Sequence, residues 1–277
     1  MKARILLLPL ALLLLLAFAQ CAKRGRPSGG PLDSIPPKPL RINPENYKTN
    51  FTGDIITVQF DEYIRLDKLQ ENLIISPPMD IPPNIKPHSV SRMLEIELKD
   101  TLSPETTYTL NFGNSIVDNN EGNILEQFKY VFSTGAHIDS LELSGKVIDS
   151  RLLKLKKKVG VNLYRLNDTY HDSIVQKGKP SYVSVTDEDG NFNFTNLEEG
   201  TYLLAAIQKG KEGNPYTYDA ERDKFAFHPS PISIPSDSTY YLHLYRAHPS
   251  YRLSRPETVS ENVIRFGYQG DGTQPEV

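Results

Sequence analysis

The residue whose chemistry stands out in this chain is Cys21, the only cysteine among 277 residues. It follows a short basic start, formed by Lys2 and Arg4, and a leucine-rich apolar run over residues 5–16. A charged start, an apolar stretch of about 12 residues and small residues before a processing site indicate a secretory signal and not a membrane span. Cleavage in front of Cys21 would place its thiol at a new N-terminus, where a lipid can be attached.

Two interpretations of this junction are open. In the first, residues 1–20 are the signal of a bacterial lipoprotein, and Cys21 becomes the acylated N-terminus. In the second, Ala17-Phe18-Ala19 is an A-x-A cleavage site, and the mature chain begins at Gln20 with an odd free thiol. We prefer the first, because it accounts for the one cysteine and for its position. The sequence therefore predicts an exported protein held to the outer membrane by a lipid on Cys21.

Other chemistry-bearing residues do not group in the sequence. The six histidines are scattered, and none of the common hydrolase, nucleotide-binding or zinc-protease motifs occurs. The stretch Asp187-Glu188-Asp189-Gly190-Asn191 superficially resembles half a calcium loop, but it lacks the spaced ligands of such a loop and is better interpreted as a turn. We therefore expect no catalytic residues, no metal site, no cofactor and no enzymatic activity.

The net charge of the chain argues against one class of partner, nucleic acid. The formal net charge of the full chain is −3, and loss of the signal removes Lys2 and Arg4 and leaves −5. A mildly acidic chain without a basic cluster does not suit a nucleic-acid-binding protein. The abundance of tyrosine, phenylalanine and proline favours strands and turns over helices.

The elements expected after this start are strands. Residues 22–39 are rich in Gly, Ser and Pro, and we interpret residues 21–39 as a tether. Alternating or short apolar patterns then predict strands over residues 54–60, 73–75, 93–98, 107–112 and 130–132. Strands about ten residues apart, separated by Pro, Asn and Gly turns, indicate an antiparallel sandwich over residues 40–135.

This segment resembles the SbsA Ig-like domain of exported bacterial proteins. The similarity rests on four motifs in the expected order, which are Phe60-Asp61-Glu62-Tyr63, residues 102–108 (LSPETTY), residues 116–123 (IVDNNEGN) and Phe132-Ser133-Thr134-Gly135. The resemblance implies a β-sandwich whose motif residues serve the scaffold, since Asn, Asp and Gly are ordinary turn residues.

A second unit is expected over residues 136–246. Apolar runs predict strands near residues 143–149, 159–164, 181–186 and 200–206, and Asp189-Gly190 is a hairpin turn signal. The succession of residues 186–192 (TDEDGNF) and residues 196–202 (NLEEGTY) resembles the carboxypeptidase-regulatory or prealbumin-like sandwich. The two units in this order behind a lipoprotein signal are similar to a group of Bacteroidetes Ig-like lipoproteins.

Several Asp-Ser/Thr-aliphatic tripeptides resemble the O-glycosylation sequon of exported Bacteroidetes proteins. Ser34 and Ser140 lie in expected linkers and are the most accessible candidates. The absence of an acidic run after Cys21 slightly favours the periplasmic face of the membrane over the cell surface. Residues 247–277 form a polar tail with one strand-like piece, Val263–Tyr268.

The sequence as a whole predicts an all-β, lipid-anchored, non-enzymatic protein of two consecutive β-sandwich domains behind a signal peptide and tether. We expect it to act as a structural or protein-interaction module of the cell envelope, with an envelope protein as partner. A glycan-binding or nutrient-uptake accessory is the alternative. That role requires exposed aromatic side chains, and Tyr216, Tyr218 and Tyr251 are the candidates in expected loops.

Overall fold

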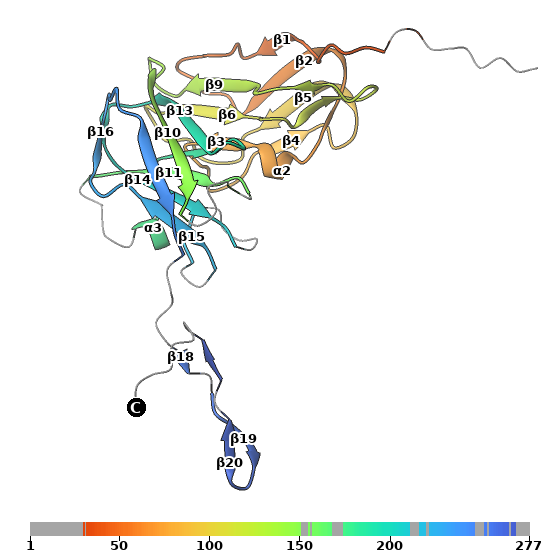
Figure 1. The fold of residues 1–277 in the computed structure, drawn as a ribbon. Helices are drawn as coiled ribbons and strands as arrows, with labels where there is room; N and C mark the ends of the chain where they lie inside the picture. The colour runs from red at the N-terminus through yellow and green to blue at the C-terminus, as the bar shows by residue number, and fades with distance from the viewer. Residues whose placement is uncertain are drawn as a thin grey trace, which may run out of the picture. The chain divides into compact units, whose positions relative to one another are not determined.

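The computed structural model describes residues 30, 32–150, 155, 157–167, 174–210, 216–219, 222–246, 252–253, 255–265 and 267–269. The chain forms two units, residues 1–34 and residues 35–277. Nearly all regular structure in the second unit is β-strand, arranged in several sheets (Figure 1). The prediction of an all-β chain with consecutive β-sandwich domains is confirmed.

The first sandwich covers the segment expected to be Ig-like. Its larger sheet has the strand order β4-β5-β2-β7-β8, with β1 also paired to β2, and its smaller sheet has the order β3-β6-β9. The bounds are β1 Pro39–Asn43, β2 Ile55–Leu66, β3 Ile74–Ser76, β4 Asn84–Lys86, β5 Ser91–Glu97, β6 Thr107–Asn111, β7 Ile116–Asp118, β8 Ile124–Leu125 and β9 Lys129–Ser133, with the short helix α2 at Leu69–Asn72. The five strands expected from the sequence are all present.

Strand β2 is long because it serves two neighbours in turn. Along one edge it pairs with β1 at Thr57–Phe60 and then with β7 at Ile64–Leu66. Along the other edge it pairs with β5 at Ile55–Gln59 and, after an irregularity, at Ile64. Alternate β2 residues, Ile56, Val58 and Phe60, are buried, as the sequence pattern indicated. They meet aromatic side chains of the smaller sheet, including Tyr108 and Phe132, whose rings stack with centroids 5.4 Å apart.

The second sandwich also consists of two sheets. One has the order β13-β10-β17, and the other has β12-β11-β14-β15 with β16 paired to β14. The bounds are β10 Leu141–Asp149, β11 Gly160–Arg165, β12 Tyr182–Val185, β13 Asn191–Leu197, β14 Gly200–Gln208, β15 Lys224–Phe227, β16 Ile232–Ile234 and β17 Tyr240–Leu244, with helix α3 at Ile174–Lys177. The pairing of β10 with β17 is parallel, and the other pairings are antiparallel.

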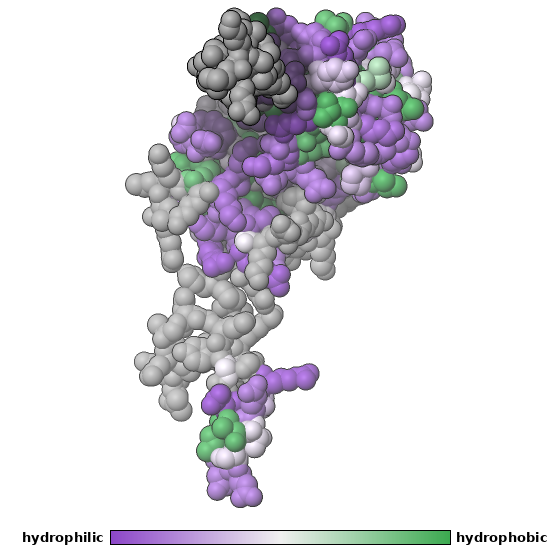
Figure 2. Space-filling view, turned by 90° about the vertical axis from the view of Figure 1, so that its right-hand side faces the viewer, coloured by the Kyte–Doolittle hydropathy of each residue, from purple (hydrophilic) through white to green (hydrophobic). Residues whose placement is uncertain are grey.

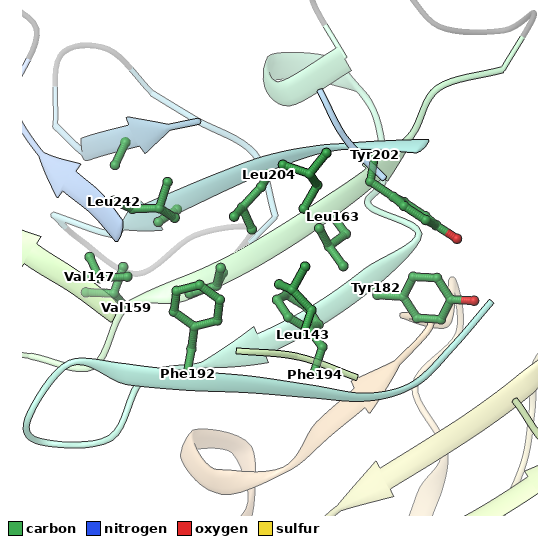
Figure 3. Packing of buried hydrophobic residues seen from close by; sticks show 14 of the residues in the cluster. Leu143, Val147, Val159, Leu163, Tyr182, Phe192, Phe194, Tyr202, Leu204 and Leu242 are labelled. Carbon is green, nitrogen blue, oxygen red and sulfur yellow. The ribbon is translucent and has the colours of Figure 1, made fainter. Parts of the chain in front are cut away.

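The core of the second sandwich lies between these sheets. Phe192 and Phe194 point from β13 into this core, and Leu163 and Leu204 enter it from the other sheet (Figure 3). Tyr182 and Tyr202 close one end with their rings 5.9 Å apart. Gly145 of β10 is required here, because a Cβ atom at this position would collide with the Tyr240 carbonyl oxygen and the Phe192 ring.

The turn predicted around Asp189-Gly190 is present, with Gly190 at φ +86°. The hairpin that this dipeptide predicted is not formed, because β12 pairs with β11 in one sheet and β13 pairs with β10 in the other. The Asp187 side chain stabilises the turn by accepting hydrogen bonds from the Asn191 backbone N–H (2.8 Å) and Nδ2 (3.0 Å). The turn therefore carries the chain from one sheet of the sandwich to the other.

The described part of the tail consists of two-stranded pairings. Strand β18 (Arg252–Leu253) pairs with β21 (Tyr268–Gln269), and β19 (Glu257–Ser260) pairs with β20 (Val263–Arg265). All residues of β19 and β20 are exposed. Across the described residues, no helix has the length and apolar character needed to cross a membrane. The expected signal, residues 1–20, and Cys21 lie outside the described residues.

Candidate binding groove

A groove of about 830 Å³ lies between the two sandwiches, which both belong to the compact unit of residues 35–277. Its floor is the outer face of sheet β13-β10-β17, and its wall is formed by the end of α2, by β3 and by the ends of β6 and β9. The third side is the segment from Ser184 to Glu188, which ends β12 and enters the turn. Small-molecule sites commonly have volumes of about 300–1,000 Å³, so the groove is large enough for such a ligand.

The floor follows from strand alternation. Leu143, Val147, Phe192 and Phe194 face the core, which leaves their neighbours in the strands on the opposite face. The strand register then places Asn191, Lys146 and Tyr241 in one row across three strands. Asn193 and Ser144 form the next row, where they lie directly opposite each other. The result is a flat face of polar side chains with one aromatic ring at its edge.

Hydrogen bonds join the two sandwiches beside the groove. Asn196 of β13 receives a hydrogen bond from the Thr109 hydroxyl (3.3 Å) and donates its Nδ2 to the Asp139 carbonyl oxygen (2.8 Å). The Val183 N–H of β12 donates to Ser76 Oγ of β3 at 3.1 Å. These contacts connect the smaller sheet of the first domain to one strand of each sheet of the second domain, so the wall and the floor of the groove are held together.

The charges that line the groove are balanced. Three lysines, Lys129, Lys146 and Lys158, stand against three acidic residues, Glu71, Asp187 and Glu188. Partial burial acts to raise the pKa of Asp187, but the hydrogen bonds from the Asn191 side chain and backbone outweigh it and hold that pKa below its usual value. Asp187 is therefore an ionised structural residue of the turn. The groove has no net charge that would select an anion or a cation.

The structure places the predicted modification sites as follows. Ser34 and Ser140 are both exposed. Ser140 follows Asp139, whose backbone N–H donates to Thr107 Oγ1 at 3.0 Å. Cys21 is outside the described residues, so the structure does not place the lipidation site.

Tyr216 and Tyr218 lie in a loop as expected, but they do not have the exposure that a glycan platform requires. Both side chains are partly buried, and burial raises the pKa of each hydroxyl. The Tyr218 ring packs on Phe225 with centroids 4.9 Å apart, because this segment covers the outer face of sheet β12-β11-β14-β15. Tyr251 lies outside the described residues. The exposed tyrosine of the groove is Tyr241, at 58% exposure, and no sequence pattern indicated it.

Groups able to bind a metal are not assembled in the described part of the chain, where no cluster of three His, Cys, Asp or Glu side chains has suitable geometry. His88, His137 and His243 are exposed and belong to different elements, while His171 and His248 lie outside the described residues. The face that Figure 2 shows is mainly hydrophilic, with hydrophobic side chains interspersed. Exposed apolar residues of the described chain include members of the first sandwich and of the tail hairpin, such as Val263 and Ile264.

The sequence signal for the groove was present but weak. Phe192 and Phe194 alternate with Asn191 and Asn193 in the sequence, so the asparagines must face outward wherever the phenylalanines are buried. Their proximity to Ser144, Lys146 and Tyr241 depends on pairings between strands far apart in the chain. The facing wall belongs to another domain, which no local pattern could indicate.

Comparison with known proteins addresses the first sandwich. Residues 33–134 match the family model of the bacterial Ig-like domain. This match supports the Ig-like assignment of the first domain and covers its whole extent. It does not reach the second sandwich. No curated protein matches the chain at a significant level.

Solved structures give broad but low similarity. The major pilin subunit BcpA of Bacillus cereus matches with 14% identity and a TM-score of 0.24, over 75% of this chain and 69% of that one. The N-terminal part of the bacterial S-layer protein SbsC matches with 14% identity and a TM-score of 0.25, over 77% of this chain and 44% of that one. Native α2-macroglobulin of Escherichia coli (domains MG0-NIE-MG1) matches with 11% identity and a TM-score of 0.24, over 86% and 79%. Such values are too low to support an inference about function.

Proposed function

We propose that this protein is a lipid-anchored, non-catalytic component of the cell envelope that acts as a structural or protein-interaction module. The observation that carries the proposal is the construction of the folded part: an Ig-like domain hydrogen-bonded to a second β-sandwich. A joint made by Asn196, Thr109 and Ser76 presents the surfaces of both domains together. Such a joint suits a spacer or a docking platform.

The most deeply buried charged groups of the second sandwich have structural roles that agree with this proposal. Asp223 accepts hydrogen bonds from Lys209 Nζ (2.5 Å), the Gly210 N–H (3.0 Å) and the Asp219 N–H (2.9 Å). Asp149 pairs with Lys224. These pairs fasten loops and strands of the second sandwich, and they leave the carboxylates engaged with the protein itself.

The second sandwich is, in this proposal, a carboxypeptidase-regulatory or prealbumin-like domain. Support comes from the segment between β12 and β14, where the Asp187–Asn191 turn precedes β13 and the Gly200–Tyr202 segment starts β14. The Tyr202 hydroxyl donates to the Glu198 carbonyl oxygen at 2.9 Å and so fixes the corner between these strands. The residues that carried the resemblance in the sequence thus have defined structural roles.

The lipid anchor is tested on the mature N-terminus. Mass spectrometry of the protein purified from membranes should give an N-terminal peptide that begins at Cys21 and carries acyl chains. The variant Cys21→Ser should lose the acyl mass and leave the membrane fraction, while the exposed control Ser34→Ala should remain there. An unmodified Cys21 preceded by Gln20 would refute the anchor.

Partner binding is tested by crosslinked affinity purification from detergent-solubilised envelopes. We expect a stoichiometric outer-membrane protein that is lost when the joint is weakened by Asn196→Ala. Recovery of the lipoprotein alone at every crosslinker length would argue against a docking role. Proteinase treatment of intact cells then distinguishes the proposed periplasmic location, in which the protein is protected, from a surface location.

The proposed O-glycans on Ser34 and Ser140 are supported by the exposure of both residues. Intact-mass measurement of the native protein should show a hexose-containing addition. Ser34→Ala and Ser140→Ala should each remove one addition, and Ser144→Ala, which lies outside any such sequon, should remove none. An intact mass equal to that of the unglycosylated chain would exclude both sites.

A further inference from the structure

We infer that the groove between the two sandwiches binds a neutral oligosaccharide. The inference deepens the proposed envelope role by naming the chemistry of one ligand, and it rests on that role. It is carried by the floor of the groove, where the row Asn191–Lys146–Tyr241 lies beside the pair Asn193–Ser144.

The polar groups of the floor suit hydroxyl groups. Asn191 donates its Nδ2 to Asp187 (3.0 Å), and this bond orients the amide and leaves its Oδ1 as an acceptor. Among the described residues, no hydrogen-bond partner is found for the Asn193 amide or for the Ser144 hydroxyl. Amides and hydroxyls both donate and accept, as sugar hydroxyls do, so each can pair with a ligand of that kind.

The aromatic ring supplies the second kind of contact. Tyr241 is 58% exposed and lies at the edge of the floor, directly across from Lys146 in the parallel β10–β17 pairing. An exposed ring offers a flat apolar face, and the C–H face of a pyranose can cover it. Polar groups beside one aromatic platform are the combination that a sugar ring requires.

The wall of the groove is ordered before any ligand arrives. Asn111 Nδ2 donates to Gln127 Oε1 at 3.2 Å, and the Asn111 Oδ1 accepts from the Gly113 N–H at 2.9 Å. Lys158 Nζ reaches Asn72 Oδ1 of α2 at 3.5 Å and connects the wall to the second sandwich. A preorganised wall lowers the entropy that a ligand loses on binding.

Charge and geometry exclude the other ligand classes. The balance of three lysines against three acidic residues disfavours nucleic acid and acidic polysaccharide. The lining mixes polar and apolar surface, so a wholly apolar ligand would leave the polar groups of the groove without partners. A peptide is usually bound by pairing with a free strand edge, whereas the floor of the groove is the face of a sheet.

The test is calorimetric titration of the full mature protein in detergent with linear hexaoses of glucose, mannose, xylose and N-acetylglucosamine. At least one should bind, and Tyr241→Ala should weaken its affinity at least about tenfold, because an aromatic contact is removed. Asn193→Ala should weaken it by a factor of about 5. Tyr63→Ala is the matched control, since Tyr63 is also half exposed on a strand but lies on the first sandwich outside the groove.

Three results would overturn the inference. The first is no binding of any neutral hexaose at about 1 mM. The second is binding that survives both Tyr241→Ala and Asn193→Ala, and the third is stronger binding of hexagalacturonic acid or of a peptide. Each variant is an exposed substitution whose folding is checked by its melting temperature. The state of Cys21 is read separately by mass spectrometry, so failure here and failure of the proposed anchor are distinguishable.

Discussion

The two sandwiches bury their carboxylates in different ways. In the first, Asp118 is fully buried and accepts hydrogen bonds from the backbone N–H groups of Asn120 (2.9 Å) and Glu121 (2.8 Å). In the second, Asp223 and Asp149 are buried against lysines. The first domain thus uses a carboxylate to shape a turn. The second uses carboxylates to fasten distant segments, which makes it more dependent on pairs of charged residues.

The cores differ as well. The first domain has one cluster with several rings from the smaller sheet and its surroundings, and Phe132 contacts the rings of Phe51, Tyr108 and Tyr130. The second domain has its main cluster between the sheets and a smaller one, around Tyr164 and Val175, on the outer face of β11 and β14. Stability should therefore be concentrated at a few aromatic residues in the first domain and spread over two layers in the second.

The largest expected effect comes from removing a ring at the centre of the first core. Phe132→Ala should lower the free energy of unfolding by about 3–5 kcal/mol, because the side chain is fully buried among three rings. Calorimetry should show the transition of the first domain at lower temperature. The matched variant Phe194→Ala should move the transition of the second domain instead. A single transition shifted equally by both variants would show that the domains unfold together.

Gly145→Ala should cause the next largest loss of stability. A Cβ at this position would collide with the Tyr240 carbonyl oxygen and would lie 2.8 Å from Cε1 of the Phe192 ring. Strands β10 and β17 would therefore have to separate. We expect a loss of about 2–3 kcal/mol in chemical denaturation. Gly53→Ala in the first domain is the control, because its Cβ would meet only the Phe51 ring at 3.6 Å. Equal effects of the two substitutions would contradict the close approach of β10 and β17.

Both domains should lose stability at low pH. Burial acts to raise the pKa values of Asp118 and Asp223, but hydrogen bonds, joined by Lys209 at Asp223, outweigh burial and hold both pKa values below normal. The unfolded chain then binds more protons than the folded chain, so the stabilisation is complete above the unfolded pKa of about 4 and is lost as pH falls through the lower folded values. Stability measured by urea titration should be flat from about pH 7 to 5 and fall below about pH 4.

Replacing each buried aspartate by asparagine shows how much of the stability lost in acid depends on each domain. Asp223→Asn should reduce stability at pH 7 by about 2 kcal/mol and reduce the loss below pH 4, since it leaves Lys209 without its carboxylate. Asp118→Asn should cost less, because no lysine is left unpaired. An unchanged acid profile in both variants would place the titrating groups elsewhere.

The stability of the first domain at high pH should depend on one buried tyrosine. Burial, assisted by Glu45, raises the pKa of Tyr130 from 10 to about 12. The folded chain then retains a proton that the unfolded chain releases, so this contribution is complete below pH 10 and is lost as pH rises towards 12. Tyr130→Phe should reduce the loss of stability between pH 10 and 12, and an unaltered loss would contradict the raised pKa.

The smallest effect is expected at the joint between the domains. Lys179 Nζ pairs with Asp80 at 2.7 Å, but the Asp80 side chain is largely exposed. Asp80→Asn should change the free energy of unfolding by less than about 0.5 kcal/mol, and added salt should remove the difference. Ser76→Ala, which removes the acceptor of the Val183 N–H, should cost about 1 kcal/mol. The reverse order would show that charge, and not the backbone hydrogen bond, holds the joint.

The sequence by itself determined the strands and the sides they bury. Ile56, Val58 and Phe60 alternate on one face of β2, and Phe192 and Phe194 on one face of β13, because successive strand side chains point in opposite directions. The Asp189-Gly190 turn was also evident, since only glycine adopts φ +86° without strain. These features depend on local sterics and on the separation of apolar from polar surface, which a single chain segment already carries.

The tertiary structure decided which strands became neighbours. The pairing of one edge of β2 first with β1 and then with β7, the parallel pairing of β10 with β17 and the crossing between sheets at Asp187–Asn191 left no local signal. The same holds for Tyr241, which joins Lys146 and Asn191 only through two strand pairings, and for Tyr216 and Tyr218, which became partly buried. Partner choice is a property of the whole packed chain, because contacts between distant segments form only where both surfaces are complementary.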